Sequence, residues 1–176
     1  LVVGANFNFG HDREGNVEYL RRVGPRLGCR VIVMPAVRFG GDRVSSTRIR
    51  GVIKRGRVEE AHRLLGRPHE VTGRVERGDR RGRELGFPTA NIGEIRQMLP
   101  SRGIYIVSAK FGAGPWRWGA ASFGVRPTVG ARHPEEQLEV YVLDWKGNVY
   151  GRPAVVRFYH RLRPERKFAS WPALIR

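Results

Sequence analysis

The first third of the chain alternates short apolar runs with one amphipathic segment. Residues 1–4 form an apolar run that ends in glycine, and residues 29–35, CRVIVMP, form a second run typical of a buried strand. Between them, residues 16–23 place apolar side chains at helical spacing, and Gly24 followed by Pro25 ends the predicted helix. Strand, helix and strand in this order predict part of a parallel α/β sheet.

Two short amphipathic helices are predicted next. Residues 44–56, VSSTRIRGVIKRG, carry isoleucines four positions apart, with serines suited to cap the start and a glycine suited to end the helix. Residues 58–66 repeat this pattern and also end in glycine. The two segments therefore predict a helical hairpin, and Pro68 marks the boundary to the rest of the chain.

From His69 onward the pattern changes to short apolar or alternating runs separated by glycine, proline and polar turns. The clearest runs occupy residues 70–78, 103–111, 116–125, 138–145 and 153–162. Five or six strands in a segment of about 100 residues predict a small closed antiparallel barrel, because closure removes exposed sheet edges.

Two further elements are predicted near the end of the chain. The sequence WKGNVYG predicts a hairpin turn near Lys146 and Gly147. The sequence PERKFASWPALIR has a helical pattern, with Pro164 or Ser170 as its start. The expected fold is therefore an α/β region followed by a small antiparallel β-barrel with a C-terminal helix.

The positive charge of the chain favours anionic binding partners. Lysine and arginine number 33 and aspartate and glutamate 16, which gives a net charge of +17. Such a field favours nucleotides, phosphorylated metabolites, nucleic acid or an acidic protein surface. An arginine-rich surface that simply faces water explains the same charge.

Cysteine content and hydropathy limit the chemistry further. Cys29 is the only cysteine, which excludes an intrachain disulfide and a multi-cysteine metal site. Its apolar surroundings predict a buried thiol. No apolar stretch approaches the roughly 20 residues needed to cross a bilayer. A cytoplasmic protein is expected.

The stretch RGRELGFPTAN combines glycines, arginines and small oxygen-bearing side chains. Gly78, Gly82 and Gly86 would let the backbone approach phosphate oxygens closely. Thr89 and Asn91, two residues apart in an extended segment, would present a hydroxyl and an amide oxygen on one face. Two neutral oxygen ligands beside nucleotide phosphates suit Mg²⁺. A glycine hairpin whose Thr and Asn side chains bond locally to the backbone fits equally well.

One carboxylate interrupts the apolar strand in QLEVYVLDW. Glu139 shares strand parity with Tyr141 and Leu143, and the opposite parity is aliphatic. A carboxylate in such a strand is paired, lies at a strand end, or serves a reaction. A general base that takes a proton from an alcohol fits this position, and so does an edge-strand glutamate paired with an arginine. Asp144 is assigned to the following turn.

A third candidate lies in VSSTRIR, at the start of the first predicted helix of the hairpin. Ser46, Thr47 and Arg50 could hold a phosphate through the helix dipole, free backbone N–H groups and positive charge. An ordinary helix cap explains the serines equally well. The five histidines show no metal-ligand spacing.

Taken together, these motifs resemble the bacterial bifunctional riboflavin kinase/FAD synthetase family. GRELGFPTAN is similar to the flavokinase motif of that family, and SSTRIR is similar to a motif of its adenylyltransferase module. GVRPT, LEVYVLD with GNVYGR, and FYHRLRPERKF follow in the expected order. GANFNFG near the start resembles the end of the adenylyltransferase core, so the resemblance covers nearly the whole chain.

The resemblance implies two domains. Residues 1–66 would be the C-terminal part of a Rossmann-like nucleotidyltransferase (FAD synthetase) domain, including the helical hairpin. Residues 67–176 would be a six-stranded antiparallel riboflavin kinase barrel with a C-terminal helix. The barrel would transfer the γ-phosphoryl group of ATP to the 5′-hydroxyl of riboflavin, giving FMN. The HxGH-type motif of the adenylyltransferase module does not occur in this sequence, so FAD formation is not expected.

The resemblance also implies roles for single residues of the barrel. Thr89 and Asn91 would bind Mg²⁺ and the ATP phosphates, with Gly82 and Gly86 flanking the nucleotide. Glu139 matches the position of the base that activates the riboflavin hydroxyl.

Further roles are implied outside this group, with one departure from the family. Ser46, Thr47 and Arg50 match the triphosphate-binding motif of the adenylyltransferase module. Arg163 and Phe168 would lie near the flavin. The family usually has a histidine two residues after the base, where this chain has tyrosine.

A basic nucleic-acid-binding barrel is the alternative function. Such barrels interleave exposed aromatic and basic residues on one sheet face. Here the aromatic residues, among them Trp116, Trp118 and Phe158, lie in several runs and are predicted mostly to fill the core, while arginines cluster in turns. Riboflavin and ATP are therefore the expected partners, nucleic acid and membrane are not, and no oligomeric state is predicted.

Overall fold

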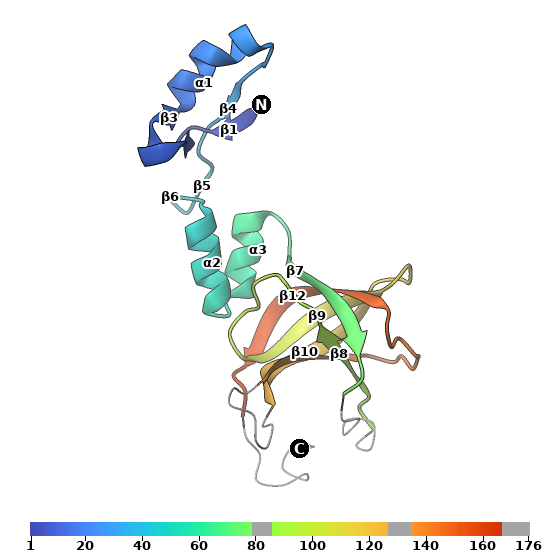
Figure 1. The fold of residues 1–176 in the computed structure, drawn as a ribbon. Helices are drawn as coiled ribbons and strands as arrows, with labels where there is room; N and C mark the ends of the chain where they lie inside the picture. The colour runs from blue at the N-terminus through green and yellow to red at the C-terminus, as the bar shows by residue number, and fades with distance from the viewer. Residues whose placement is uncertain (79–85, 127–134, 167–176) are drawn as a thin grey trace. The chain divides into compact units, whose positions relative to one another are not determined.

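The structure is a computed structural model that describes residues 1–78, 86–126 and 135–166 (Figure 1). The chain divides into two compact units, Leu1–Ser45 and Ser46–Arg176. None of the helices in the described ranges is long and apolar enough to cross a membrane.

The first unit contains short strands and one α-helix. Its elements are β1 (Val2–Gly4), β2 (Asn8–Phe9), the 3₁₀ turn η1 (His11–Arg13), β3 (Gly15–Asn16), α1 (Val17–Val23), the 3₁₀ turn η2 (Gly24–Leu27), β4 (Ile32–Met34), β5 (Arg38–Phe39) and β6 (Asp42–Arg43). β1 and β4 pair in parallel, which confirms the predicted strand–helix–strand order. Asn16 caps α1 by accepting a hydrogen bond from the backbone N–H of Tyr19 at 2.9 Å.

The burial predicted for the second apolar run of this unit is wrong. Ile32 and Met34 are 42% and 51% exposed, and the Cys29 thiol is also exposed. The reason is that β4 pairs with β1 in a sheet of only two strands. An apolar run becomes a buried strand only where other elements cover both of its faces.

The second unit begins with the predicted helical hairpin. α2 (Ser46–Lys54) and α3 (Val58–Leu65) are joined at Gly56, whose φ of +73° lies in the left-handed region that glycine adopts without strain. Gly66 ends α3 in the same way, with φ of +69°. Both predicted helices and their glycine stops are confirmed.

A six-stranded antiparallel barrel forms the rest of this unit (Figure 1). Its strands are β7 (His69–Glu76), β8 (Thr89–Gly93), β9 (Gly103–Phe111), β10 (Arg117–Arg126), β11 (Glu135–Val142) and β12 (Pro153–Arg163). They close in the order β10-β11-β8-β7-β12-β9, which confirms the predicted closed barrel. The predicted C-terminal helix falls largely beyond residue 166, outside the described residues.

Alternate residues of each strand fill the barrel core. Tyr105 and Phe158 are fully buried there, with ring centroids 5.3 Å apart in an edge-to-face arrangement. His69 stacks on Phe158 and its Nε2 lies 2.8 Å from the carbonyl oxygen of Met98. Burial lowers the pKa of His69, so a neutral ring that donates this hydrogen bond is favoured.

Helix α3 is tied to the barrel at an irregularity of β12. The register of β12 against β9 shifts between Phe158 and His160 and again after Arg161. The Glu59 carboxylate accepts a hydrogen bond from the backbone N–H of Arg161 at 3.0 Å and lies 2.5 Å from His160 Nδ1. Val58, also on α3, is fully buried within the barrel core. The helical pair therefore satisfies a backbone donor at the bulge and fills the core.

The predicted hairpin turn near Lys146 and Gly147 is wrong. β11 pairs with β8 and β10, whereas β12 pairs with β7 and β9, so residues 143–152 connect strands that are not neighbours. Packing and backbone hydrogen bonds hold this connection, since Trp145 stacks on Phe111 with ring centroids 5.8 Å apart and the Gly151 N–H donates to the Val75 carbonyl at 2.8 Å. Asp144 does lie in a turn, with φ of +48°.

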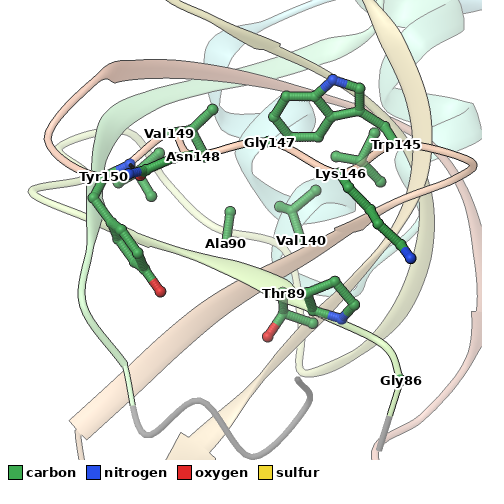
Figure 2. Close-up of a pocket in the computed structure, with 13 residues that line it drawn as sticks. Gly86, Thr89, Ala90, Val140, Trp145, Lys146, Gly147, Asn148, Val149 and Tyr150 are labelled. Carbon is green, nitrogen blue, oxygen red and sulfur yellow. Dashed lines mark hydrogen bonds between the residues drawn. The ribbon is translucent and has the colours of Figure 1, made fainter. Parts of the chain in front are cut away.

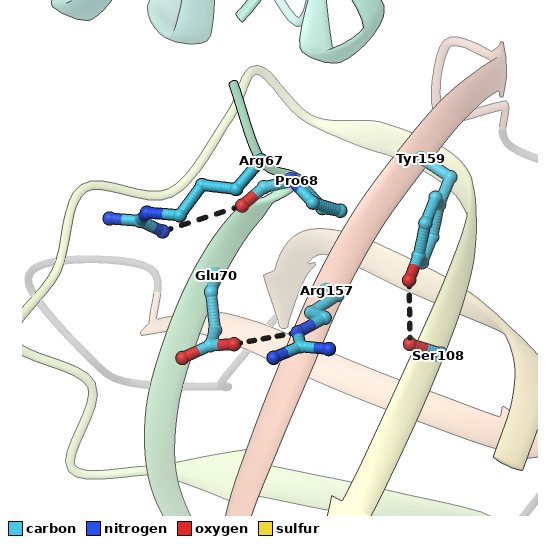
Figure 3. A network of polar contacts seen from close by, with 6 residues as sticks. All are labelled: Arg67, Pro68, Glu70, Ser108, Arg157 and Tyr159. Atoms are coloured by element: carbon cyan, nitrogen blue, oxygen red, sulfur yellow. Dashed lines mark hydrogen bonds and ion pairs between the residues drawn. The ribbon is translucent and has the colours of Figure 1, made fainter. Parts of the chain in front are cut away.

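Polar and aromatic side chains cover the outer face of β7, β12 and β9. Arg157 Nε donates to Glu70 Oε2 at 2.7 Å and Ser108 donates to the Tyr159 hydroxyl at 3.3 Å (Figure 3). The Arg157 guanidinium also lies 3.8 Å from the ring centroid of Trp116.

The tryptophans of this region correct one prediction. Phe158 is in the core, as predicted, but Trp118 is 55% exposed and Trp116 is 38% exposed. Trp118 packs against Tyr159, with ring centroids 4.8 Å apart. Parity explains the exposure, because the buried Gly119 and Ala121 occupy the inward positions of β10 and leave the even-numbered neighbours outside.

Candidate functional site

Two distant motifs meet where β8 pairs with β11. In the antiparallel register, Asn91 lies opposite Glu139 and Thr89 lies opposite Tyr141. Ile92, Leu138 and Val140, which have the opposite strand parity, are buried in the barrel core, so the functional candidates face outward. The structure thus brings together three of the residues that the sequence singled out.

The Thr89 hydroxyl donates a hydrogen bond to Glu139 Oε2 at 3.3 Å. Both side chains are half-buried, which leaves one side of the carboxylate accessible. β11 has strand neighbours on both sides, so the interpretation of Glu139 as an edge-strand residue is wrong. In the part of the chain that the structure describes, Glu139 is oriented by a neutral hydroxyl, which suits a carboxylate that must stay available as a proton acceptor.

Asn91 is contacted from β11 and from the segment that follows β7. Gln137 Nε2 donates a hydrogen bond to Asn91 Oδ1. A Cβ atom placed on Gly78 would lie 2.1 Å from Asn91 Nδ2, so the glycine makes room for the amide. The hydrogen bonds described for the Thr89 and Asn91 side chains therefore run across to β11. The alternative interpretation, in which both side chains bond to the local backbone of a glycine hairpin, does not match these contacts.

A cavity of about 540 Å³ opens beside Thr89 (Figure 2). Ala90 and Val140 form its floor, while Lys146 and Tyr150 lie on opposite sides of it. Gly86 also lines the cavity and has φ of +83°, so it supplies backbone in the left-handed region where the chain enters β8. An apolar floor with a few polar groups at the rim is typical of a small-molecule site.

Sequence reasoning missed the residues that the β11–β12 connection adds to this cavity. Lys146, Asn148 and Tyr150 line it because the connection crosses between non-neighbouring strands. The glycine in WKGNVYG gave a turn signal, and nothing in the local pattern distinguishes a hairpin from a crossing connection. Only the order of the strands in the barrel identifies these residues as part of the cavity.

The donor set on the outer face of β8 and β11 fits a hard cation that takes few protein ligands. A hydroxyl, an amide and a carboxylate lie on one face at Thr89, Asn91 and Glu139. Within the described ranges, no group of three or more His, Cys, Asp and Glu side chains gathers as a metal site. Oxygen donors in small number suit Mg²⁺, which retains waters and is usually completed by substrate phosphates.

The remaining predicted residues lie elsewhere or outside the described ranges. Ser46, Thr47 and Arg50 are in α2, which packs on α3, and none of them lines the cavity beside Thr89. Arg163 ends β12 opposite Ile104 of β9. Gly82 and Phe168 are outside the described residues.

The chain is similar to known proteins along its whole length. Residues 65–176 match the riboflavin kinase family and residues 1–48 match the FAD synthetase family. Relatives named bifunctional riboflavin kinase/FMN adenylyltransferase include proteins of Pseudomonas fluorescens, 42% identical over 174 residues, and Escherichia coli strain K12, 39% identical over 171 residues. These matches cover 99% and 97% of this chain but 55% and 54% of the relatives.

A solved structure matches this chain over a similar share of its length. A crystal structure described as a macrolide-efflux protein from Streptococcus pneumoniae is 33% identical, with a TM-score of 0.82 over 98% of this chain and 55% of that one. The chain therefore spans about half the length of the relatives that it matches. The riboflavin kinase match alone takes in more than half of the residues, all of the barrel among them, and so the chain belongs to the riboflavin kinase family.

Proposed function

We propose that this chain transfers the γ-phosphoryl group of ATP to the 5′-hydroxyl of riboflavin, giving FMN and ADP. The observation that carries the proposal is the outward-facing group of Thr89, Asn91 and Glu139, in which Thr89 also lines a cavity of about 540 Å³. Family membership supports small-molecule substrates of this kind.

Glu139 acts as the general base in this proposal. The carboxylate accepts the proton of the ribityl hydroxyl as its oxygen attacks the γ-phosphorus, and ADP leaves with the electron pair of the broken bond. Thr89 keeps the carboxylate oriented through the hydrogen bond between its hydroxyl and Glu139 Oε2. Little covalent work falls to the protein, so positioning the hydroxyl in line supplies most of the acceleration.

Thr89 and Asn91 would hold Mg²⁺ together with the ATP phosphates. A cation held there would neutralise charge on the phosphate oxygens during transfer. Gly82 and Gly86 would flank the nucleotide, as the family motif implies, since glycine backbone can approach phosphates closely. The cytoplasm, where ATP and Mg²⁺ are available, is the proposed location.

The cavity of Figure 2 would take the adenosine part of ATP. Its apolar floor at Ala90 and Val140 suits a flat ring, and Tyr150 offers an aromatic face. Lys146, on the side of the cavity opposite Tyr150, adds positive charge that suits the phosphate end.

Two assignments outside the cavity complete the proposal. Arg163 and Phe168 would lie near the flavin. Ser46, Thr47 and Arg50 would belong to the triphosphate site of an adenylyltransferase module within residues 1–66, whose upstream motif this sequence does not contain, so this chain would make FMN and not FAD.

One assay tests the proposal. The chain is incubated with riboflavin, ATP and Mg²⁺, and FMN and FAD are separated by chromatography. FMN without FAD is the expected result. The absence of both products would overturn the kinase proposal, and FAD would show that the adenylyltransferase site is sufficient in this chain.

Nucleic-acid binding is the second candidate function, because the fold brings together aromatic and basic side chains that are far apart in the sequence. Trp116, Trp118 and Arg157 lie on one outer face of the barrel, and exposed aromatic and basic side chains on a sheet face can stack with bases. The discriminating measurement is ionic strength. Affinity for a single-stranded oligonucleotide should fall steeply with added salt, whereas saturation by riboflavin should change little.

A further inference from the structure

The Asn91 side chain has a hydrogen-bond partner on one side and a glycine on the other. Its oxygen accepts a hydrogen bond from Gln137 Nε2, and its nitrogen is the atom nearest to a Cβ placed on Gly78, at 2.1 Å. Gly78 therefore leaves room for the amide, and the hydrogen bond from Gln137 is the described contact that orients it.

The contact with Gln137 repeats a geometry already present at the base. Thr89 lies opposite Tyr141 but donates to Glu139, two residues earlier on β11. Asn91 lies opposite Glu139 but bonds to Gln137, again two residues earlier. Two parallel diagonal hydrogen bonds thus follow one another along the same outer face. Gln137 has the same position relative to Asn91 as Glu139 has relative to Thr89.

We propose that Gln137 is a positioning residue whose side-chain amide sets the orientation of Asn91 for binding the metal–nucleotide complex. A carbonyl oxygen has two lone pairs, so one can accept from Gln137 while the other remains available to a cation. Without this donor the Asn91 amide can turn over and present an N–H group, which cannot ligate a cation. The inference rests on the proposed function, since it assigns Asn91 to the metal-bound nucleotide.

The size of the effect follows from the surroundings of Gln137. The side chain is half-buried and borders a polar cavity of about 330 Å³ that Asn91 also lines. Groups that orient a metal ligand typically contribute 10- to 100-fold in metal affinity, and water that reaches the pair can replace part of the contact. A loss of about tenfold is therefore expected.

The test replaces Gln137 by methionine, which keeps the length of the side chain and removes its hydrogen bonds. Affinity for ADP is measured by calorimetry with and without Mg²⁺, and FMN formation is titrated with Mg²⁺ in parallel. Gln137→Met should lower the Mg²⁺-dependent gain in ADP affinity about tenfold and leave metal-free ADP binding unchanged. The Mg²⁺ concentration for half-maximal activity should rise by the same factor.

Gln97→Met is the matched control. Gln97 also donates a side-chain hydrogen bond to a neighbouring strand, to the Thr72 hydroxyl at 2.7 Å, and it lines neither of the two cavities. This variant should keep the Mg²⁺ response of the wild type. Gly78→Ala perturbs Asn91 from its other side and should reproduce the loss caused by Gln137→Met.

Several results would overturn the positioning role. They are an unchanged Mg²⁺ gain in Gln137→Met, an equal loss of ADP affinity with and without Mg²⁺, or a fall in melting temperature well beyond that of Gln97→Met. The last would mark Gln137 as a structural residue. A wild-type chain that forms no FMN would overturn the proposed function and this inference together, whereas FMN formation with an unaltered Mg²⁺ response would overturn the inference alone.

Discussion

The two compact units use their apolar residues differently. Within Leu1–Ser45, all of which the structure describes, Val3 is the one buried hydrophobic side chain, and Ile32 and Met34 remain exposed. In the second unit, alternate residues of each barrel strand are buried and their neighbours form an outer face. The same kind of apolar run therefore becomes core only where a closed sheet covers it.

The largest expected effect tests whether the chemistry belongs to the barrel face. Glu139→Gln removes the proton acceptor and should lower FMN formation roughly 10²- to 10⁴-fold while ADP binding persists. The matched control is Glu136→Gln on the same strand, where the exposed carboxylate bonds to Arg102 at 3.2 Å. Near-native turnover in Glu139→Gln would show that another group accepts the proton.

The next effect tests which unit the helical pair belongs to, and with it the domain boundary predicted after residue 66. Val58 of α3 is fully buried in the barrel core, so Val58→Ala should lower the free energy of unfolding by about 2 kcal/mol. All four tryptophans follow residue 115, so their fluorescence in urea reports on the barrel. Val2→Ala, at a position 63% exposed in the first unit, is the control. Equal midpoints for the two variants would separate α3 from the barrel.

A smaller effect concerns pH and the buried His69. Burial lowers its pKa, so the folded protein binds a proton less readily than the unfolded chain. The contribution of His69 is therefore present in full above about pH 6.5, the ordinary histidine value, and declines as the pH falls below it.

His69→Gln can still donate to the Met98 carbonyl but does not titrate. The melting temperature of the wild type should fall more between pH 7 and pH 5 than that of the variant. Parallel pH profiles would show that His69 titrates alike in the folded and unfolded states.

The smallest effect is expected in the first unit. Cys29 is exposed, so it should react with a thiol reagent in the folded protein as readily as in denaturant. Cys29→Ser should leave the tryptophan-monitored unfolding unchanged, within about 0.5 kcal/mol for a surface substitution. A protected thiol would mean that this unit has a better packed interior than the exposure of Cys29 indicates.

The sequence predicted the positions of helices and strands better than it predicted which strands pair and which faces are buried. Alternation in residues 138–142 identified β11, because burial of Leu138 and Val140 leaves a period of two that no helix shares. The exposure of Trp118 was missed because both faces of that strand carry apolar residues, and parity does not say which face is inside.

The candidate site was predictable only in part, because some of its residues are recognised by type and motif and others only by strand pairing. Thr89, Asn91 and Glu139 carry chemistry in their residue types and motifs, so they stand out in one dimension. Gln137 and Lys146 do not, since a glutamine or lysine near a strand end is ordinary. Their roles depend on strand register and on which strands the connection after β11 joins, and both are set by long-range pairing.

The pairing of β7 with β12 also bears on how the chain emerges from the ribosome. Glu70 and Arg157, bonded across this pair, are 87 residues apart, so the first strand of the barrel meets its partner only when the last strand has been made. At 5–20 residues per second, β7 waits roughly 4 to 17 s with one edge unpaired. The β8–β11 pair that carries the candidate site is complete before that moment, so barrel closure during synthesis would follow assembly of the site.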